Sequence, residues 1–350
     1  MKRHMAQRAM GNGPWVHLDI WVRLIAHCLL LIALFAVPSR ADTTGATFLQ
    51  IGSGAAPLAL GNAYTASAGD IDSLYYNPGG LAALNRPELS ITHSDWLEGT
   101  EFDVVSYGQP TPVGTLAVGA IRLGGGTEQG RDALRIETGD FTTQDLAVLL
   151  GWSRSIDDLA GIGANVKFIH SQIDVNGASD YAFDAGSVIK IPALPVWVGG
   201  SVLNLGPGLR FLDQSDPLPL TIAGGAAMKP MERLRLEVDL KREPYDQITE
   251  LDGGAEWVAS IFSFRIGYQS PLQGAVYNSL YTGQNIRGGI GLNISRYRFD
   301  YTLAPFGDLG LTQRFTLSVR FGEDRAQPHN LKSLDSSSLT PSSLWGLHPD

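Results

Sequence analysis

The chain has 350 residues, of which 44% are hydrophobic and 17% charged, and it carries a formal net charge of −9. Residues 1–41 hold five of the 26 basic and one of the 35 acidic residues, so the remainder carries 21 basic and 34 acidic side chains and a net charge of −13. Nucleic-acid binding needs a basic footprint, so this balance excludes a nucleic-acid partner. The single cysteine, Cys28, excludes a disulfide framework and a thiolate metal site.

The first 41 residues have the order of a secretory signal peptide. Three basic residues (Lys2, Arg3 and Arg8) precede an apolar run of fourteen, Leu24–Val37, and small residues follow at 39–41. Fourteen residues are fewer than the roughly 20 that a membrane-spanning helix needs. We therefore expect residues 1–41 to be a signal peptide. The apolar run continues after Cys28, which argues against lipoprotein cleavage at that cysteine.

Residues 42–86 are expected to form a small N-terminal plug, or hatch. The stretch Leu58–Leu84 is rich in Gly, Ala and small polar residues and has neither helical periodicity nor strand alternation. It contains the turn Asn77-Pro78-Gly79-Gly80, in which Asn can bond its own backbone and Pro fixes φ. This turn is either a gate in a lumenal path or a structural anchor of the plug. Asp70 and Asp72 are expected to be turn or helix N-terminal residues rather than charges that gate the lumen.

From Pro87 onward, apolar and polar residues alternate with period 2, which predicts strands. In Arg233–Lys241 (RLRLEVDLK), four aliphatic side chains alternate with five charged ones. Fourteen such segments are expected, at about 87–94, 101–109, 114–123, 144–154, 159–172, 180–191, 195–204, 218–228, 233–242, 248–258, 261–269, 285–294, 297–305 and 311–321.

The connections alternate between tight turns and long loops, the long ones being 124–143, 205–217 and 270–284. An even strand number with this rhythm is typical of an outer-membrane β-barrel. A soluble sandwich, barrel or propeller shows the same alternation, but the signal peptide and the loop rhythm favour a membrane barrel over residues 87–321. Residues 322–350, rich in Ser, Pro and Asp, are expected to be a disordered tail.

Charged side chains on the inner face of such a barrel need partners. We expect a ladder of lumenal ion pairs, of which only a few members would contact cargo; the candidates are Arg265, Arg287, Arg298, Asp300, Arg314 and Glu256. Aromatic residues near the strand ends are expected to form interfacial girdles; these are Trp96, Tyr107, Trp152, Trp257, Tyr268, Tyr297 and Phe321.

No motif indicates an enzyme. In His93-Ser94-Asp95-Trp96, neighbouring strand residues point to opposite faces, so no base can reach a nucleophile. Gly124-Gly125-Gly126 follows a strand but opens no helix, so it is a loop rather than a phosphate cradle. His170 has no ligand spacing around it. We therefore expect no catalysis, no metal and no cofactor.

The plug block GNAYTASAGDIDSLYYNPGGLAAL and the closing segment Tyr297–Phe321 resemble the PorV/PorQ type of outer-membrane protein, a relative of the FadL/TodX hydrophobic-compound transporters. Asn77-Pro78-Gly79 stands where FadL-type plugs have Asn-Pro-Ala. The resemblance implies a fourteen-stranded barrel with an N-terminal hatch in the outer membrane of a Gram-negative-type bacterium.

It also implies two functions. The first is passage of small hydrophobic molecules, fatty-acid or hydrocarbon-like, through the plugged lumen. The alternative is a PorV-like protein-interaction barrel in type IX secretion or surface attachment of secreted cargo. The expected partners are outer-membrane lipid, a hydrophobic small molecule or secreted protein cargo, and the barrel-assembly machinery.

Overall fold

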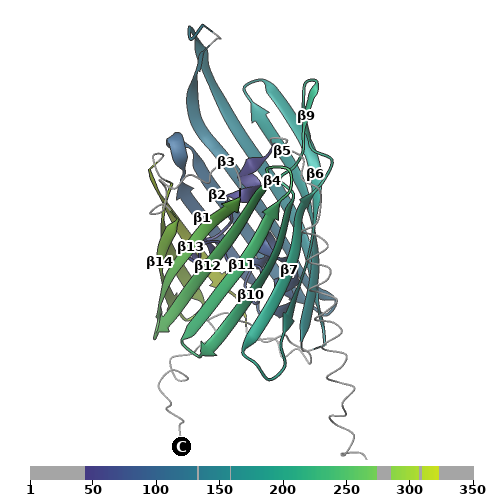
Figure 1. The fold of residues 1–350 in the computed structure, drawn as a ribbon, viewed down its shortest axis with the longest axis vertical. Coiled ribbons are helices and arrows are strands. Elements are labelled where there is room, and N and C mark those ends of the chain that lie inside the picture. The colour runs from purple at the N-terminus through teal and green to yellow at the C-terminus, as the bar shows by residue number, and fades with distance from the viewer. Residues whose placement is uncertain (1–43, 132–133, 158, 274–284, 307–309, 323–350) are drawn as a thin grey trace, which may run out of the picture. The chain divides into compact units, whose positions relative to one another are not determined.

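The computed structural model describes residues 44–131, 134–157, 159–273, 285–306 and 310–322, and these form a closed antiparallel barrel of fourteen strands (Figure 1). Each strand pairs with its neighbours along the chain, and β1 pairs with β16 to close the barrel. The strands are β1 (Glu88–Asp95), β2 (Glu101–Thr111), β3 (Gly114–Arg131), β4 (Glu137–Ile156), β5 (Ala160–Ile173), β6 (Asn176–Lys190), β7 (Val196–Leu205), β10 (Thr221–Met231), β11 (Leu234–Glu243), β12 (Ile248–Ala259), β13 (Phe262–Gln273), β14 (Ile286–Ile294), β15 (Tyr297–Pro305) and β16 (Leu311–Arg320). The predicted fourteen-stranded barrel is thereby confirmed.

The two faces of the wall show which solvent surrounds it. On β13, Phe264 and Ile266 are 49% and 58% exposed, whereas Arg265 between them is 6% exposed. A soluble barrel would bury the apolar face and expose the charges. Here the apolar face is outside and the charges are inside, as in a barrel that is surrounded by lipid. The closed wall also leaves no unpaired backbone edge, which the bilayer requires. The protein is an outer-membrane β-barrel.

Strands β3 and β4 extend far beyond their expected ends. Their pairing continues as far as Arg131 and Glu137, so most of the stretch predicted as a loop is a long hairpin, which rises above the other strands in Figure 1. Gly124-Gly125-Gly126, expected in that loop, instead lies in β3 at a register shift between Gly124 and Thr127. A second small hairpin, β8 (Leu209–Phe211) and β9 (Gln214–Asp216), lies within the long connection between β7 and β10.

Residues 44–87 fill the barrel as short pieces: the 3₁₀ helix η1 (Thr47–Gln50), the helices α2 (Ala55–Ala59) and α3 (Ser73–Tyr76), and the 3₁₀ helix η2 (Pro78–Ala83). Every residue from 53 to 84 is buried. Helix α2 contacts β13 to β16, whereas η2 contacts β3 to β6 on other strands of the wall. We call residues 44–87 the plug.

The remaining expectations divide between described and undescribed residues. The expected signal peptide and all but Gly322 of the expected tail lie outside the described residues. Within the described part of the chain, no helix has the length and apolar character to cross a membrane. Trp152, Trp257, Tyr268, Tyr297 and Phe321 are 38–44% exposed on the wall. Trp96, expected as an interfacial anchor, instead follows β1 and packs inward against Phe102 and Phe306.

Candidate functional site

The Asn77 turn joins the plug to the wall. Asn77 is 1% exposed, and its Oδ1 accepts a hydrogen bond from the Gly79 N–H at 3.0 Å, which caps η2 with Pro78 at the first position. Its Nδ2 donates to the carbonyls of Thr65 in the plug at 2.6 Å and of Ser187 in β6 at 2.9 Å. One amide therefore fixes a helix start, a second plug segment and a wall strand together.

Glycines of the wall allow this close approach. A Cβ at Gly163 in β5 would overlap the carbonyl of Pro78, and a Cβ at Gly186 in β6 would overlap the side chain of Asn77. Within the turn, a Cβ at Gly79 would lie 2.6 Å from the Cα of Ser187. Backbone therefore packs directly on backbone, which only Gly permits. A Cβ at Gly80 would overlap the Ser67 carbonyl, so the final residue of the motif is fixed by packing inside the plug.

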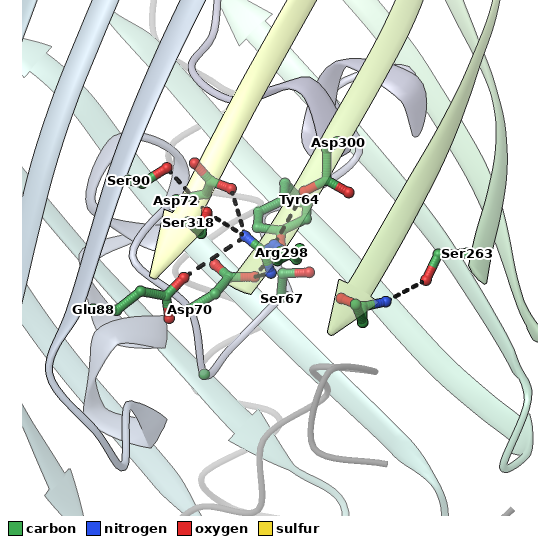
Figure 2. A network of polar contacts seen from close by, with 12 residues as sticks. Tyr64, Ser67, Asp70, Asp72, Glu88, Ser90, Ser263, Arg298, Asp300 and Ser318 are labelled. Carbon is green, nitrogen blue, oxygen red and sulfur yellow. Dashed lines mark hydrogen bonds and ion pairs between the residues drawn. The ribbon is translucent and has the colours of Figure 1, made fainter. Parts of the chain in front are cut away.

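A second connection is a buried ionic network centred on Arg298 of β15 (Figure 2). Its guanidinium lies 3.0 Å from Asp300, 3.5 Å from Asp72 and 4.0 Å from Asp70. It also lies 3.7 Å from Glu88 at the start of β1, which pairs with Arg320 at 2.9 Å. The Tyr64 hydroxyl donates to Asp70 from within the plug. Two plug carboxylates and two wall carboxylates thus surround one cation.

The network continues along the wall. Arg265 bridges Asp300 at 2.7 Å and Glu256 at 2.8 Å, and Arg235 lies 3.5 Å from Glu256. Further plug contacts follow on β11, where Asp239 accepts hydrogen bonds from the Tyr64 and Thr65 backbone N–H groups, both at 2.8 Å. Because these charges are buried, each of them needs an ion pair or hydrogen bonds to offset the cost of removing it from water.

Asp72 does not have its expected role. It precedes α3, but its side chain makes no capping hydrogen bond and lies against Arg298 instead. Burial, and next the neighbouring Asp70 carboxylate, raise the pKa of Asp72 well above its ordinary value, against the opposing effect of Arg298. The site therefore holds more carboxyl groups than its cations neutralise.

All six predicted lumenal residues are buried on the inner face, but they separate into two groups. Arg265, Arg298, Asp300 and Glu256 form the ionic network. Arg287 and Arg314, expected in the same ladder, form no ion pair with any described residue. They lie instead against aromatic rings near the outer ends of β14 and β16.

Sequence reasoning did not single out Tyr64, Arg235, Glu237 and Asp239 as site residues. The alternation in β11 does place the last three on the inner face, and that is the signal by which they could have been found. Nothing in the sequence specifies which plug atoms they meet.

A small cavity lies between the plug and the outer halves of the strands. Its volume is about 70 Å³, and its lining includes Gly52 and Tyr76 of the plug and Asn204, Lys241, Glu250 and Gln269 of the wall. This is about half of the roughly 150 Å³ that suffices to hold benzene. The plug must therefore move before this cavity can admit a hydrocarbon.

The two histidine positions that we expected to be neither catalytic nor metal-binding lie at the barrel surface. His93 faces outward and contacts Asp103 at 2.7 Å, whereas Ser94 faces inward and donates to the Gln313 carbonyl at 2.8 Å. His170 is exposed, with Ser179 as its partner at 2.8 Å. The described residues contain no group of three His, Cys, Asp or Glu side chains that could hold a metal ion.

Comparison with solved structures identifies the fold. The Pseudomonas putida toluene transporter TodX aligns over 77% of this chain and 96% of its own, with 13% identity and a TM-score of 0.54. A TodX deltaS2S3 mutant, a monoaromatic hydrocarbon channel, aligns over 78% and 99%, with 14% identity and a TM-score of 0.56. A Pseudomonas aeruginosa FadL homologue aligns over 80% and 99%, with 10% identity and a TM-score of 0.52. The chain shares their barrel fold.

No protein-family model matches the chain. No curated protein matches it either.

Proposed function

We propose that this outer-membrane barrel passes small hydrophobic molecules through its lumen, past the plug. The observation that carries the proposal is a plug, bonded to the wall at Asn77 and Asp72, inside a barrel whose fold is that of a toluene transporter and a hydrocarbon channel. The plug makes separate contacts with the β5–β6 wall and with β15.

Uptake of labelled toluene tests this function. Because a lipopolysaccharide leaflet slows the free entry of apolar molecules, the vesicles should carry lipopolysaccharide outside and phospholipid inside. We expect vesicles with the barrel to take up toluene several-fold faster than empty ones. Toluene uptake no faster than in empty vesicles would contradict the function.

The second candidate is the PorV-like role in secretion or attachment. Its support is the resemblance of the plug block and the last hairpin, together with tight outer connections such as the two-residue turn between β5 and β6. Extraction in mild detergent followed by native mass spectrometry discriminates the two. A stoichiometric protein partner supports attachment, whereas a bound apolar molecule supports transport.

A further inference from the structure

Two buried arginines near the outer end of the barrel have no acidic partner. Arg314 is fully buried, and its Nε and Nη2 have no hydrogen-bond acceptor; Arg287 is 7% exposed, and its Nε and Nη1 have none. The only hydrogen bond from either guanidinium to another described residue is from Arg314 Nη1 to the Gly52 carbonyl, at 2.9 Å. Buried donors without acceptors are costly, so four unused N–H-bearing atoms require an explanation.

Aromatic rings that contact one another lie against both guanidinium groups. Arg314 lies 4.9 Å from the ring centroid of Phe102 and 5.8 Å from that of Trp96. Arg287 lies 5.7 Å from Phe306, whose ring meets Trp96 edge-on at 4.9 Å. These separations are within the range of cation–π attraction, which stabilises the cations without using their in-plane N–H donors. We call Trp96, Phe102, Phe306, Arg287 and Arg314 the arginine–aromatic cluster.

The cluster borders the cavity above the plug. Gly52, which accepts a hydrogen bond from Arg314, lines that cavity, as does Glu250, whose carboxylate charge acts on Arg287. Glu250 and Asp252 are the acids that influence Arg287, yet neither lies within ion-pair distance of it. The half-buried rings of Trp96 and Phe306 provide a surface toward the outside.

We infer that the arginine–aromatic cluster binds a small aromatic carboxylate, with the carboxylate between Arg287 and Arg314 and the ring against Trp96 and Phe306. Guanidinium groups bind carboxylates through paired in-plane N–H donors, and those are the donors left unused here. Aromatic rings prefer offset or edge contacts of the kind that Trp96 and Phe306 already make. The inference rests on the proposed function, because it names a substrate class for the same lumen.

Benzoate and toluene form a matched pair of probes, since benzoate carries a carboxylate where toluene carries a methyl group on the same ring. Equilibrium binding of each is measured on the full-length barrel in detergent, for wild type, Arg287→Gln and Arg314→Gln. The control is Arg122→Gln, on the outer wall, where Arg122 pairs with Asp103. We expect each lumenal variant to weaken benzoate binding at least tenfold, to change toluene binding less than twofold, and the control to change neither.

Benzoate binding that is not saturable, or that both lumenal variants leave unchanged, would overturn the inference. Dodecanoate displacing benzoate at lower concentration would overturn the aromatic assignment. Arg287→Gln removes no hydrogen bond to a described residue, so it keeps the test valid if Arg314→Gln does not fold. Failure here leaves toluene uptake into vesicles intact, whereas failure of the proposed function abolishes it.

Discussion

At the residue scale, the structure depends on side chains that connect the plug to the wall. Asn77 and Arg298 are the clearest examples, because each contacts two plug positions and at least one wall strand. Asn77 acts through hydrogen bonds to backbone carbonyls, and Arg298 acts through charge. The two can therefore be tested separately.

Replacing Asn77 with Asp keeps the acceptor for Gly79 but removes both donated hydrogen bonds and places a charge beside two carbonyls. We expect a loss of about 2–4 kcal/mol from the buried groups left unsatisfied, and faster protease cleavage within residues 44–87. Asn293→Asp is the control, because Asn293 contacts only Ser263 of the wall among the described hydrogen bonds. Equal cleavage of the two variants would contradict the role of Asn77.

Replacing Arg298 with Gln leaves several carboxylates buried without their shared cation. Removing one partner of a buried ion pair costs about 3–5 kcal/mol, and we expect a loss of that size in urea unfolding. Arg122→Gln breaks an exposed pair and should cost at most about 1 kcal/mol. Similar unfolding midpoints for the two variants would show that the network does not stabilise the plug.

Asp72 makes the stability of the plug dependent on pH. Its pKa is raised in the folded state, so the folded protein binds this proton more tightly, and stability falls as pH rises above the unfolded value of 3.8. Asp72→Asn removes that dependence. We expect the thermal midpoint of the variant to exceed that of wild type increasingly from pH 4 to pH 8. Parallel pH profiles would contradict a raised pKa.

At the element scale, membrane-crossing strands were predictable and extramembrane ones were not. Within the bilayer, each outward residue must be apolar, so the apolar–polar alternation of the sequence predicts the positions of β11 and β13 closely. Beyond the bilayer, water faces both sides of a strand, and the Gly- and Thr-rich stretch from Gly124 to Thr143 lacks alternation although it pairs as a hairpin.

The outer part of the β3–β4 hairpin should be dispensable for barrel stability. Beyond the pair Thr127–Thr142, residues 128–131 pair only with residues 137–141 in the ladder, whereas Thr143 and Gln144 pair with β5. Replacing residues 128–141 with an Asn-Gly turn should leave the urea midpoint unchanged within error, because such a turn suits a two-residue hairpin flanked by the pair Thr127–Thr142. A clear drop in the midpoint would mean that the hairpin supports the wall.

The candidate site was less predictable than the strands. The alternation predicts that four arginine side chains point into the lumen, namely Arg265, Arg287, Arg298 and Arg314. It does not predict their partners, which depend on how the plug is placed against each strand. Arg298 meets two plug acids, whereas Arg314 meets a plug carbonyl and aromatic rings. Trp96 continues the inward face of Thr92 and Ser94 beyond the end of β1, so the alternation itself turns its ring toward Phe102 rather than toward the interface.

At the scale of the whole molecule, the central claim is that apolar molecules pass when the plug moves. The direct test locks the plug reversibly. The Ala55 N–H donates to Thr316 Oγ1 at 2.8 Å, so the two Cα atoms lie near the separation that a disulfide spans. With Cys28 expected to leave with the signal peptide, a cysteine pair at these positions would be the only thiols of the mature chain.

The decisive measurement is therefore the initial rate of toluene uptake into lipopolysaccharide-containing vesicles by the Ala55→Cys, Thr316→Cys barrel, with and without reductant. The account predicts that the reduced barrel takes up toluene at the wild-type rate and that oxidation lowers the rate to that of empty vesicles. Uptake that is fast in both states would contradict plug movement. Uptake no faster than in empty vesicles, for wild type and reduced barrel alike, would contradict transport itself.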